Sequence, residues 1–149
     1  MKRVLFVCIG NCIRSQMAEG FAATYGRDVI QPFSAGLSPA GYVSEIATKV
    51  MAERGIAIGD NYSKSIPEAA GAPYDLLINI SGEAVPARGL AKEVRTWNVA
   101  DPMSKKEPAY QEAAQQIENL VMALVLELRV AQRPTPINRP ATKGIQKPR

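Results

Sequence analysis

The chain has 149 residues, 46% of them hydrophobic, which is enough for one domain with its own core. No run of about 18 apolar residues occurs, so no membrane span is expected, and the apolar run near the N-terminus is too short for a signal peptide. With two cysteines and no histidine, we expect a cytoplasmic protein with reduced thiols, without a metal site and without imidazole-based catalysis.

The net charge of +4 is concentrated at the C-terminus. Residues 130–149 contain five basic residues and no acidic one, so the net charge of the rest is 4 minus 5, or −1. The same segment holds four of the eleven prolines. We therefore predict a catalytic domain over residues 1–129 and a basic, proline-rich tail over 130–149 that is extended or disordered. A nearly neutral domain gives no reason to expect a nucleic-acid partner.

The first part of the chain alternates strand and helix patterns. A continuous apolar run predicts a buried parallel strand at Val4–Val7. Helical spacing of apolar residues, followed by a glycine, predicts a helix over residues 15–26. A second strand is expected over residues 29–36, where the proline suits an edge position.

The alternation continues to the predicted tail. Ser44 is a suitable cap for a helix that runs to about Arg54. Strands are expected at Asp75–Ile80 and Val94–Val99, and Pro108 opens the longest helix. Four strands separated by helices predict an α/β fold, a single doubly wound domain in which helices flank both faces of a four-stranded parallel sheet.

Both cysteines lie between the first strand and the first helix, in the stretch CIGNCIRS. Ligands of such sheets bind where strand ends meet helix starts. Gly10 and Asn11 tolerate positive φ angles, which would let this stretch curl over the strand end with its N–H groups turned inward. The helix N-terminus adds partial positive charge. The stretch therefore predicts a phosphate-binding loop made of Cys8, Ile9, Gly10, Asn11, Cys12, Ile13, Arg14 and Ser15.

Cys8 is the candidate nucleophile of this loop. A thiol that faces a helix N-terminus and an arginine is expected to be largely thiolate at neutral pH. Ser15 can donate a hydrogen bond to the sulfur, and the planar guanidinium of Arg14 can bind a tetrahedral oxyanion. The stretch matches neither GxGxxG nor the Walker spacing, so no cofactor is expected.

The pattern Cys-x5-Arg-Ser after an apolar strand resembles the phosphate-binding loop of the low-molecular-weight protein tyrosine phosphatases, whose fold the thioredoxin-coupled arsenate reductases share. The segments SQMAEG, FSAG, DLLINI and TWNVADP follow in the family's order, so the resemblance covers roughly residues 2–129. It implies that Cys8 forms a cysteinyl-phosphate and that Arg14 holds the developing charge. It also implies that Asp101, in an Asp-Pro pair, protonates the leaving oxygen and then activates water. Ser34 would help to shape the loop.

The chain departs from the family pattern at several points. The family often has a cysteine immediately before the loop arginine, whereas here Ile13 stands there and Cys12 precedes it. Cys12 is therefore either a redox partner of Cys8 or a small hydrophobic filler. The thioredoxin-coupled reductases carry two further cysteines after the third strand, where this chain reads INISGEAVPARG. No aromatic residue directly follows the Asp-Pro pair, so Tyr42 is the candidate for gripping a phosphotyrosine ring.

Three interpretations follow. The first is a cysteine-dependent phosphomonoester hydrolase that acts on a phosphorylated protein or a small phosphomonoester. The second is an arsenate reductase that uses Cys8 together with Cys12 or an external thiol reductant. The third is a non-catalytic module that binds phosphate or a phosphoprotein, which the presence of both Cys8 and Asp101 disfavours.

Overall fold

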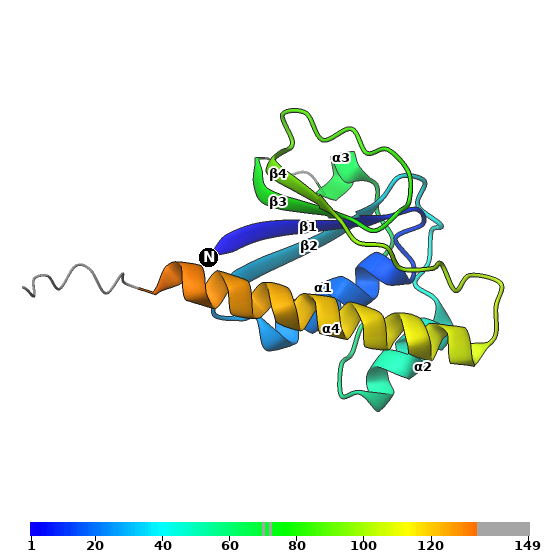
Figure 1. The fold of residues 1–149 in the computed structure, drawn as a ribbon. Coiled ribbons are helices and arrows are strands. Elements are labelled where there is room, and N and C mark those ends of the chain that lie inside the picture. The colour runs from blue at the N-terminus through cyan, green and yellow to red at the C-terminus, as the bar shows by residue number, and fades with distance from the viewer. Residues whose placement is uncertain (70, 72, 134–149) are drawn as a thin grey trace, which may run out of the picture.

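A four-stranded parallel sheet forms the centre of the computed structural model, which describes residues 1–69, 71 and 73–133 (Figure 1). Its strands are arranged in the order β2-β1-β3-β4. They span β1 (Lys2–Cys8), β2 (Ile30–Gly36), β3 (Tyr74–Asn79) and β4 (Ala91–Thr96). All pairs are parallel, so the carboxyl ends of the strands meet at one edge of the sheet. This confirms the predicted α/β fold.

The last strand differs from its predicted bounds. The apolar pattern predicted Val94–Val99, whereas β4 begins at Ala91 and ends at Thr96. The strand lies at the edge of the sheet and is largely exposed, with the sequence AKEVRT. Charged residues are tolerated there because one side of an edge strand faces solvent, and so hydrophobicity is a poor guide to its bounds.

In the part of the chain that the structure describes, four helices connect and cover the strands. They are α1 (Arg14–Tyr25), α2 (Glu45–Glu53), the short α3 (Ile66–Ala69) and α4 (Glu107–Gln132). The predicted cap of α2 is present, because Ser44 Oγ accepts a hydrogen bond from the amide of Ala47 at 3.2 Å. No helix in the described part of the chain is long and apolar enough to cross a membrane. The predicted tail begins too early, because α4 continues through residues 130–132, and residues 134–149 lie outside the described residues.

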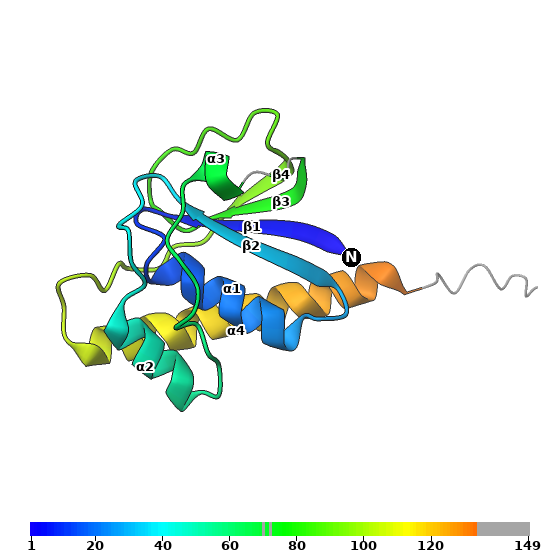
Figure 2. The same ribbon diagram turned by 180° about the vertical axis from the view of Figure 1, so that it is seen from behind.

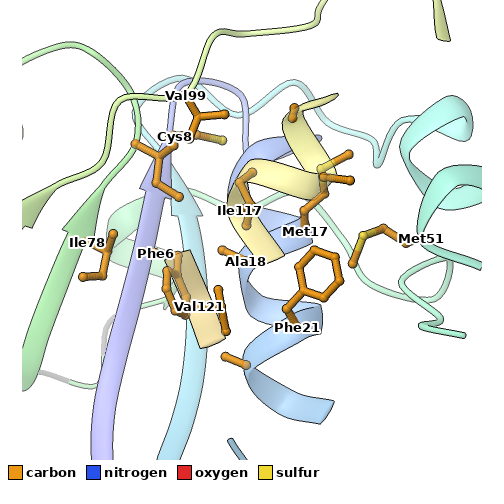
Figure 3. Close-up of a cluster of buried hydrophobic side chains, with 14 of the residues drawn as sticks. Phe6, Cys8, Met17, Ala18, Phe21, Met51, Ile78, Val99, Ile117 and Val121 are labelled. Carbon is orange, nitrogen blue, oxygen red and sulfur yellow. The ribbon is translucent and has the colours of Figure 1, made fainter. Parts of the chain in front are cut away.

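The two faces of the sheet are covered differently (Figures 1 and 2). Alternate residues of β1 point to opposite faces. On one face Phe6 packs in the larger core with residues of α1 and α4, among them Phe21 and Ile117 (Figure 3). On the other face Leu5 and Val7 pack with residues of β3, of α3 and of the segment between β3 and β4. Both ends of the loop after β1 are thus held by buried elements.

Phe21 tests how much the packing of α1 contributes to stability. Its ring is fully buried in the larger core, so Phe21→Ala is expected to lower the free energy of unfolding by about 3–5 kcal/mol. Leu126→Ala is the control, because Leu126 on α4 is 55% exposed and should cost less than about 0.5 kcal/mol. Urea unfolding followed by circular dichroism measures both changes. Equal losses in the two variants would contradict the assignment of the core.

Candidate active site

The loop between β1 and α1 directs its carbonyl groups outward. The amides of Leu37, Ser38 and Ala40 donate to the carbonyls of residues 8, 9 and 10 at 3.1, 2.8 and 2.9 Å. The amide of Ser44 donates to the carbonyl of residue 12 at 3.0 Å. Within the described residues, by contrast, the backbone N–H groups of residues 10–15 donate to no main-chain carbonyl. Unpartnered amides at a helix N-terminus form a binding site for an anion.

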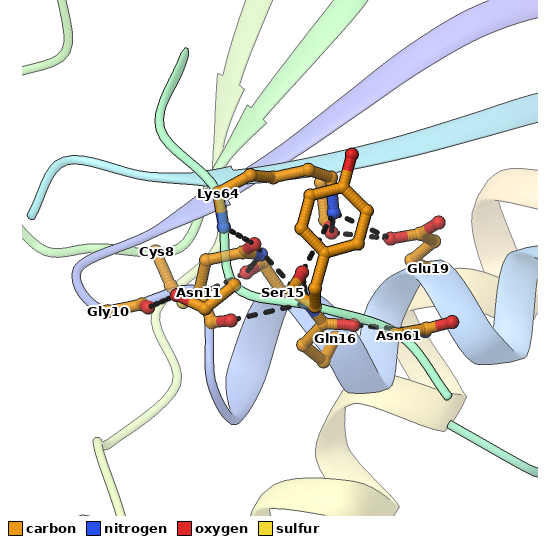
Figure 4. A network of polar contacts seen from close by, with 11 residues as sticks. Cys8, Gly10, Asn11, Ser15, Gln16, Glu19, Asn61 and Lys64 are labelled. Atoms are coloured by element: carbon orange, nitrogen blue, oxygen red, sulfur yellow. Dashed lines mark hydrogen bonds and ion pairs between the residues drawn. The ribbon is translucent and has the colours of Figure 1, made fainter. Parts of the chain in front are cut away.

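Asn11 gives the loop its curvature and is held from two sides (Figure 4). Its φ angle is +49°, in the left-handed region that asparagine tolerates. Its side-chain oxygen accepts from the amide of Lys64 at 2.9 Å and from the side chain of Gln16 at 3.2 Å. Because both contacts hold the side-chain oxygen, they also fix the direction of the side-chain nitrogen Nδ2.

A chain of hydrogen bonds leads from Asn11 to the buried thiol of Cys8 (Figure 4). Asn11 Nδ2 donates to Ser15 Oγ at 2.7 Å, and Ser15 Oγ lies 3.0 Å from Cys8 Sγ. Either atom of this contact can be the donor when Cys8 carries its proton, but a sulfur with negative charge can only accept, and the Ser15 hydroxyl then donates to it. A hydroxyl directed in this way stabilises a sulfur that carries negative charge.

Arg14 is buried at the same edge of the sheet and is tied to strand ends. Its Nη1 donates to the carbonyls of Ile80 at 2.8 Å and Val99 at 3.0 Å, which uses both hydrogens of that nitrogen. Its Nη2 lies 3.4 Å from Asp101 Oδ2. Asp101 is half-exposed, and its other oxygen accepts from the amide of Met103 at 3.0 Å. The guanidinium thus keeps Nε–H and part of Nη2 for an oxyanion.

The three candidate catalytic side chains meet at one cavity of about 230 Å³. Cys8, Arg14 and Asp101 all line it, together with Ser38, Ala40, Met103 and four further loop residues, Ile9, Gly10, Cys12 and Ile13. The two other predicted loop residues, Asn11 and Ser15, do not line it and act from behind the loop. Tyr42 does not line this cavity and contributes instead to a neighbouring one with Ile46 and Tyr110. The sequence-based candidate for gripping an aromatic ring is therefore displaced from the thiol.

Cys12 also lines this cavity, and both cysteines are free thiols. Burial raises the pKa of Cys12 to about 11, with further contributions from the neighbouring Cys8 and Asp101. Cys12 therefore carries its proton at neutral pH and contributes an uncharged lining to the cavity.

Sequence reasoning missed the polar cluster that holds the segment around Lys64. The side chain of Lys64 is mostly buried, donates to Ser34 Oγ at 3.3 Å and lies 4.0 Å from a carboxylate oxygen of Glu19. Ser34 in turn donates to Glu19. Ser34 thus contacts the loop indirectly, through Lys64, whose amide donates to Asn11. No local pattern could have identified these contacts, because Lys64 and Asn11 are 53 positions apart.

Known proteins match nearly the whole described chain. The model of the low molecular weight phosphotyrosine protein phosphatases matches residues 3–133. The glutaredoxin arsenate reductase of Synechocystis sp. is 34% identical over 131 residues, covering 86% of this chain and 99% of that protein. The probable low molecular weight protein-tyrosine-phosphatase EpsP of Ralstonia nicotianae is 31% identical, covering 87% and 97%. A solved arsenate reductase in the phosphate binding state has a TM-score of 0.78 at 33% identity, covering 86% and 99%.

Gly36 tests the packing of the loop against the end of β2. A Cβ atom at this position would lie 2.7 Å from the carbonyl oxygen of Ile9 and 2.8 Å from the amide of Asn11. Neither backbone group can move without shifting the loop, so Gly36→Ala is expected to lower the free energy of unfolding by about 1–3 kcal/mol. At Gly59 a Cβ would meet only a methyl group at 3.3 Å, and Gly59→Ala should be nearly neutral in the same urea titration. A stable Gly36→Ala would contradict the close approach.

Cys12→Ser is expected to reduce the loss of stability at alkaline pH. The folded chain holds the Cys12 proton up to its pKa of about 11, whereas the ordinary value is 9.0. Between these values the folded state binds more protons than the unfolded state, so stability falls as pH rises, by at most about 1.4 kcal/mol per pH unit. Urea unfolding below and within this window compares wild type with Cys12→Ser. Parallel losses in both proteins would mean that Cys12 titrates normally.

Proposed function

The chain belongs to the low molecular weight phosphotyrosine protein phosphatase family, and on that premise we propose that it is a cysteine-dependent phosphomonoester hydrolase with a cysteinyl-phosphate intermediate. The observation that carries this proposal is the convergence of Cys8, Arg14 and Asp101 on one cavity whose loop amides donate to no main-chain carbonyl within the described residues. These groups supply a nucleophile, an oxyanion site and a proton donor.

In the first step the phosphoryl oxygens bind the loop amides and the Nε–H and Nη2–H groups of Arg14. Bound oxyanion competes with Asp101 for Nη2, which lies 3.4 Å from the carboxylate, and so releases Asp101 to face the leaving oxygen. The sulfur of Cys8 attacks phosphorus, and the ester P–O bond breaks. The leaving oxygen takes a proton from Asp101.

In the second step water hydrolyses the cysteinyl-phosphate. The Asp101 carboxylate accepts a proton from the water, whose oxygen attacks phosphorus while the S–P bond breaks. The electron pair of that bond returns to the sulfur of Cys8, where the Ser15 hydroxyl at 3.0 Å stabilises it. Arg14 remains bound to the phosphoryl oxygens throughout. Since the cycle needs a reduced Cys8, we place the enzyme in a reducing compartment, the cytoplasm.

The substrate is a phosphorylated protein or a small phosphomonoester with an apolar leaving group. The mouth of the cavity carries Ile9 and Met103, which are 37% and 38% exposed. Apolar side chains at this place favour burial of a hydrophobic group attached to the phosphate. Tyr42 is available only to a substrate that extends into the neighbouring cavity.

Arsenate reduction is the second candidate, because similar proteins include arsenate reductases at 34% identity. Here the Cys8 sulfur would attack arsenic and displace one arsenate oxygen, which leaves as water, and a second thiolate would then attack that sulfur. The S–As bond would then break with its electron pair moving to arsenic, which yields arsenite and a disulfide. Cys12 is the one other cysteine of the chain. Because its pKa is raised to about 11, little of it is deprotonated at neutral pH and able to attack. An external thiol is the better partner.

Two aryl phosphates distinguish the roles of Cys8 and Asp101. Cys8→Ser should abolish hydrolysis of both para-nitrophenyl phosphate and phenyl phosphate. Asp101→Asn should slow phenyl phosphate hydrolysis by roughly 10²–10⁴-fold, because the poorer leaving group depends on the proton. In kcat/KM, which reports the steps up to departure of the leaving group, the effect on para-nitrophenyl phosphate should be smaller. Steady-state kinetics measure both. Full activity of Asp101→Asn on phenyl phosphate would exclude Asp101 as the acid.

The same proteins decide between hydrolysis and reduction. We expect ester hydrolysis that is lost in Cys8→Ser and kept in Cys12→Ser. Arsenate is supplied separately with thioredoxin, glutaredoxin or a small thiol. Arsenate reduction that needs Cys8, without appreciable ester hydrolysis, would overturn the phosphatase proposal in favour of the reductase. Activity in neither assay would favour a phosphate-binding module.

A further inference from the structure

Hydrogen bonds to two strand-end carbonyls set the orientation of the buried Arg14. Its side chain lies between the cavity of Cys8 and a second, open cavity of about 300 Å³, which Ile80, Gly82 and Val99 also line. The bonds from Nη1 to the carbonyls of Ile80 and Val99 therefore determine which N–H groups face the oxyanion.

The carbonyl of Ile80 belongs to a turn, residues 79–83, that is closed by its own side chains. Asn79 Oδ1 accepts from the amide of Ser81 at 2.9 Å and from Ser81 Oγ at 2.6 Å. Asn79 Nδ2 donates to the carbonyl of Glu83 at 2.8 Å, and the amide of Glu83 donates to Ser81 Oγ at 3.0 Å. Gly82 completes the turn with a φ angle of +80°.

One peptide group connects this turn to the active site. The C=O of Ile80 and the N–H of Ser81 belong to the same rigid peptide plane, and they point in opposite directions. The N–H end is held by Asn79 Oδ1 and the C=O end accepts from Arg14. Asn79 and Ser81 are buried, so water does not readily replace these bonds. Fixing one end of the plane fixes the other.

We propose that the turn 79–83 is a positioning element for Arg14, in which Asn79 and Ser81 are positioning residues for oxyanion binding. They touch no substrate and act through the Ile80 carbonyl. The inference rests on the proposed function only in that Arg14 binds a phosphoryl oxyanion. It holds equally for hydrolysis and for phosphate binding without turnover.

Two glycines with the same backbone strain allow a matched test. Gly82 and Gly89 both have positive φ angles, +80° and +76°, and an added Cβ at either would meet no atom within 4 Å. Alanine therefore introduces the same conformational strain at both, without a clash. Only Gly82 belongs to the turn that holds Arg14. Ser81→Ala is the direct variant, because it removes the hydroxyl shared by Asn79 and Glu83.

Binding of inorganic phosphate, measured by calorimetry, is the first readout. Ser81→Ala and Gly82→Ala should weaken it by about five- to twenty-fold, as expected for a disturbed hydrogen bond to a charged group. Gly89→Ala should change it by less than about two-fold. If Ser81→Ala fails to fold, Gly82→Ala carries the test. Equal effects of Gly82→Ala and Gly89→Ala would overturn the proposal.

Alkylation of Cys8 is the second readout. It compares two reagents that differ in charge, and a general loss of stability would not change the ratio of their rates. The anionic reagent iodoacetate is attracted by a correctly oriented Arg14, whereas neutral iodoacetamide is not. Ser81→Ala and Gly82→Ala should therefore lower the ratio of the two alkylation rates, with Gly89→Ala unchanged. An unchanged ratio would overturn the proposal. Neither readout needs turnover, so a wild-type protein that binds phosphate without hydrolysing esters would refute the proposed function alone.

Discussion

The site depends on which backbone groups of the loop from Cys8 to Ser15 are bonded within the protein and which are left for a ligand. The carbonyls of this loop accept hydrogen bonds from the segment that follows β2. The amides of residues 10–15 are thereby left for a ligand, within the described part of the chain. This division requires the loop to lie against the end of β2, where Gly36 leaves room for the backbone of Ile9 and Asn11. Without this packing of the loop, the end of β1 would carry a thiol but no binding site for an oxyanion.

The same arrangement gives the two cysteines different chemistry. The sulfur of Cys8 lies 3.0 Å from a hydroxyl that Asn11 and, behind it, Lys64 hold in place. Cys12 lies on the same loop, yet burial and nearby negative charge raise its pKa to about 11. Only three residues therefore separate a candidate nucleophile from a neutral thiol. An internal disulfide relay is disfavoured by this contrast, and ester hydrolysis needs only Cys8.

Most of the fold and the centre of the site could be predicted because their signals are local. Buried parallel strands read as apolar runs, and Gly10, Asn11, Arg14 and Ser15 are residue types suited to a curled anion-binding loop. The edge strand β4 was misplaced because exposure removes the apolar signal. The partners of Arg14 and Asn11 could not be predicted, because they are main-chain groups brought together by the fold. The carbonyls of Ile80 and Val99 are 66 and 85 positions from Arg14, and neither side chain contributes to these bonds.

The most direct test of this account is to ask whether a phosphoryl group becomes bonded to Cys8. Wild-type protein would be mixed with para-nitrophenyl phosphate, quenched within the first turnover, digested and examined by mass spectrometry. The account predicts one phosphoryl group on Cys8 that disappears as the substrate is exhausted, and none in Cys8→Ser. Turnover without phosphorylation of Cys8, or phosphorylation of another residue, would contradict it.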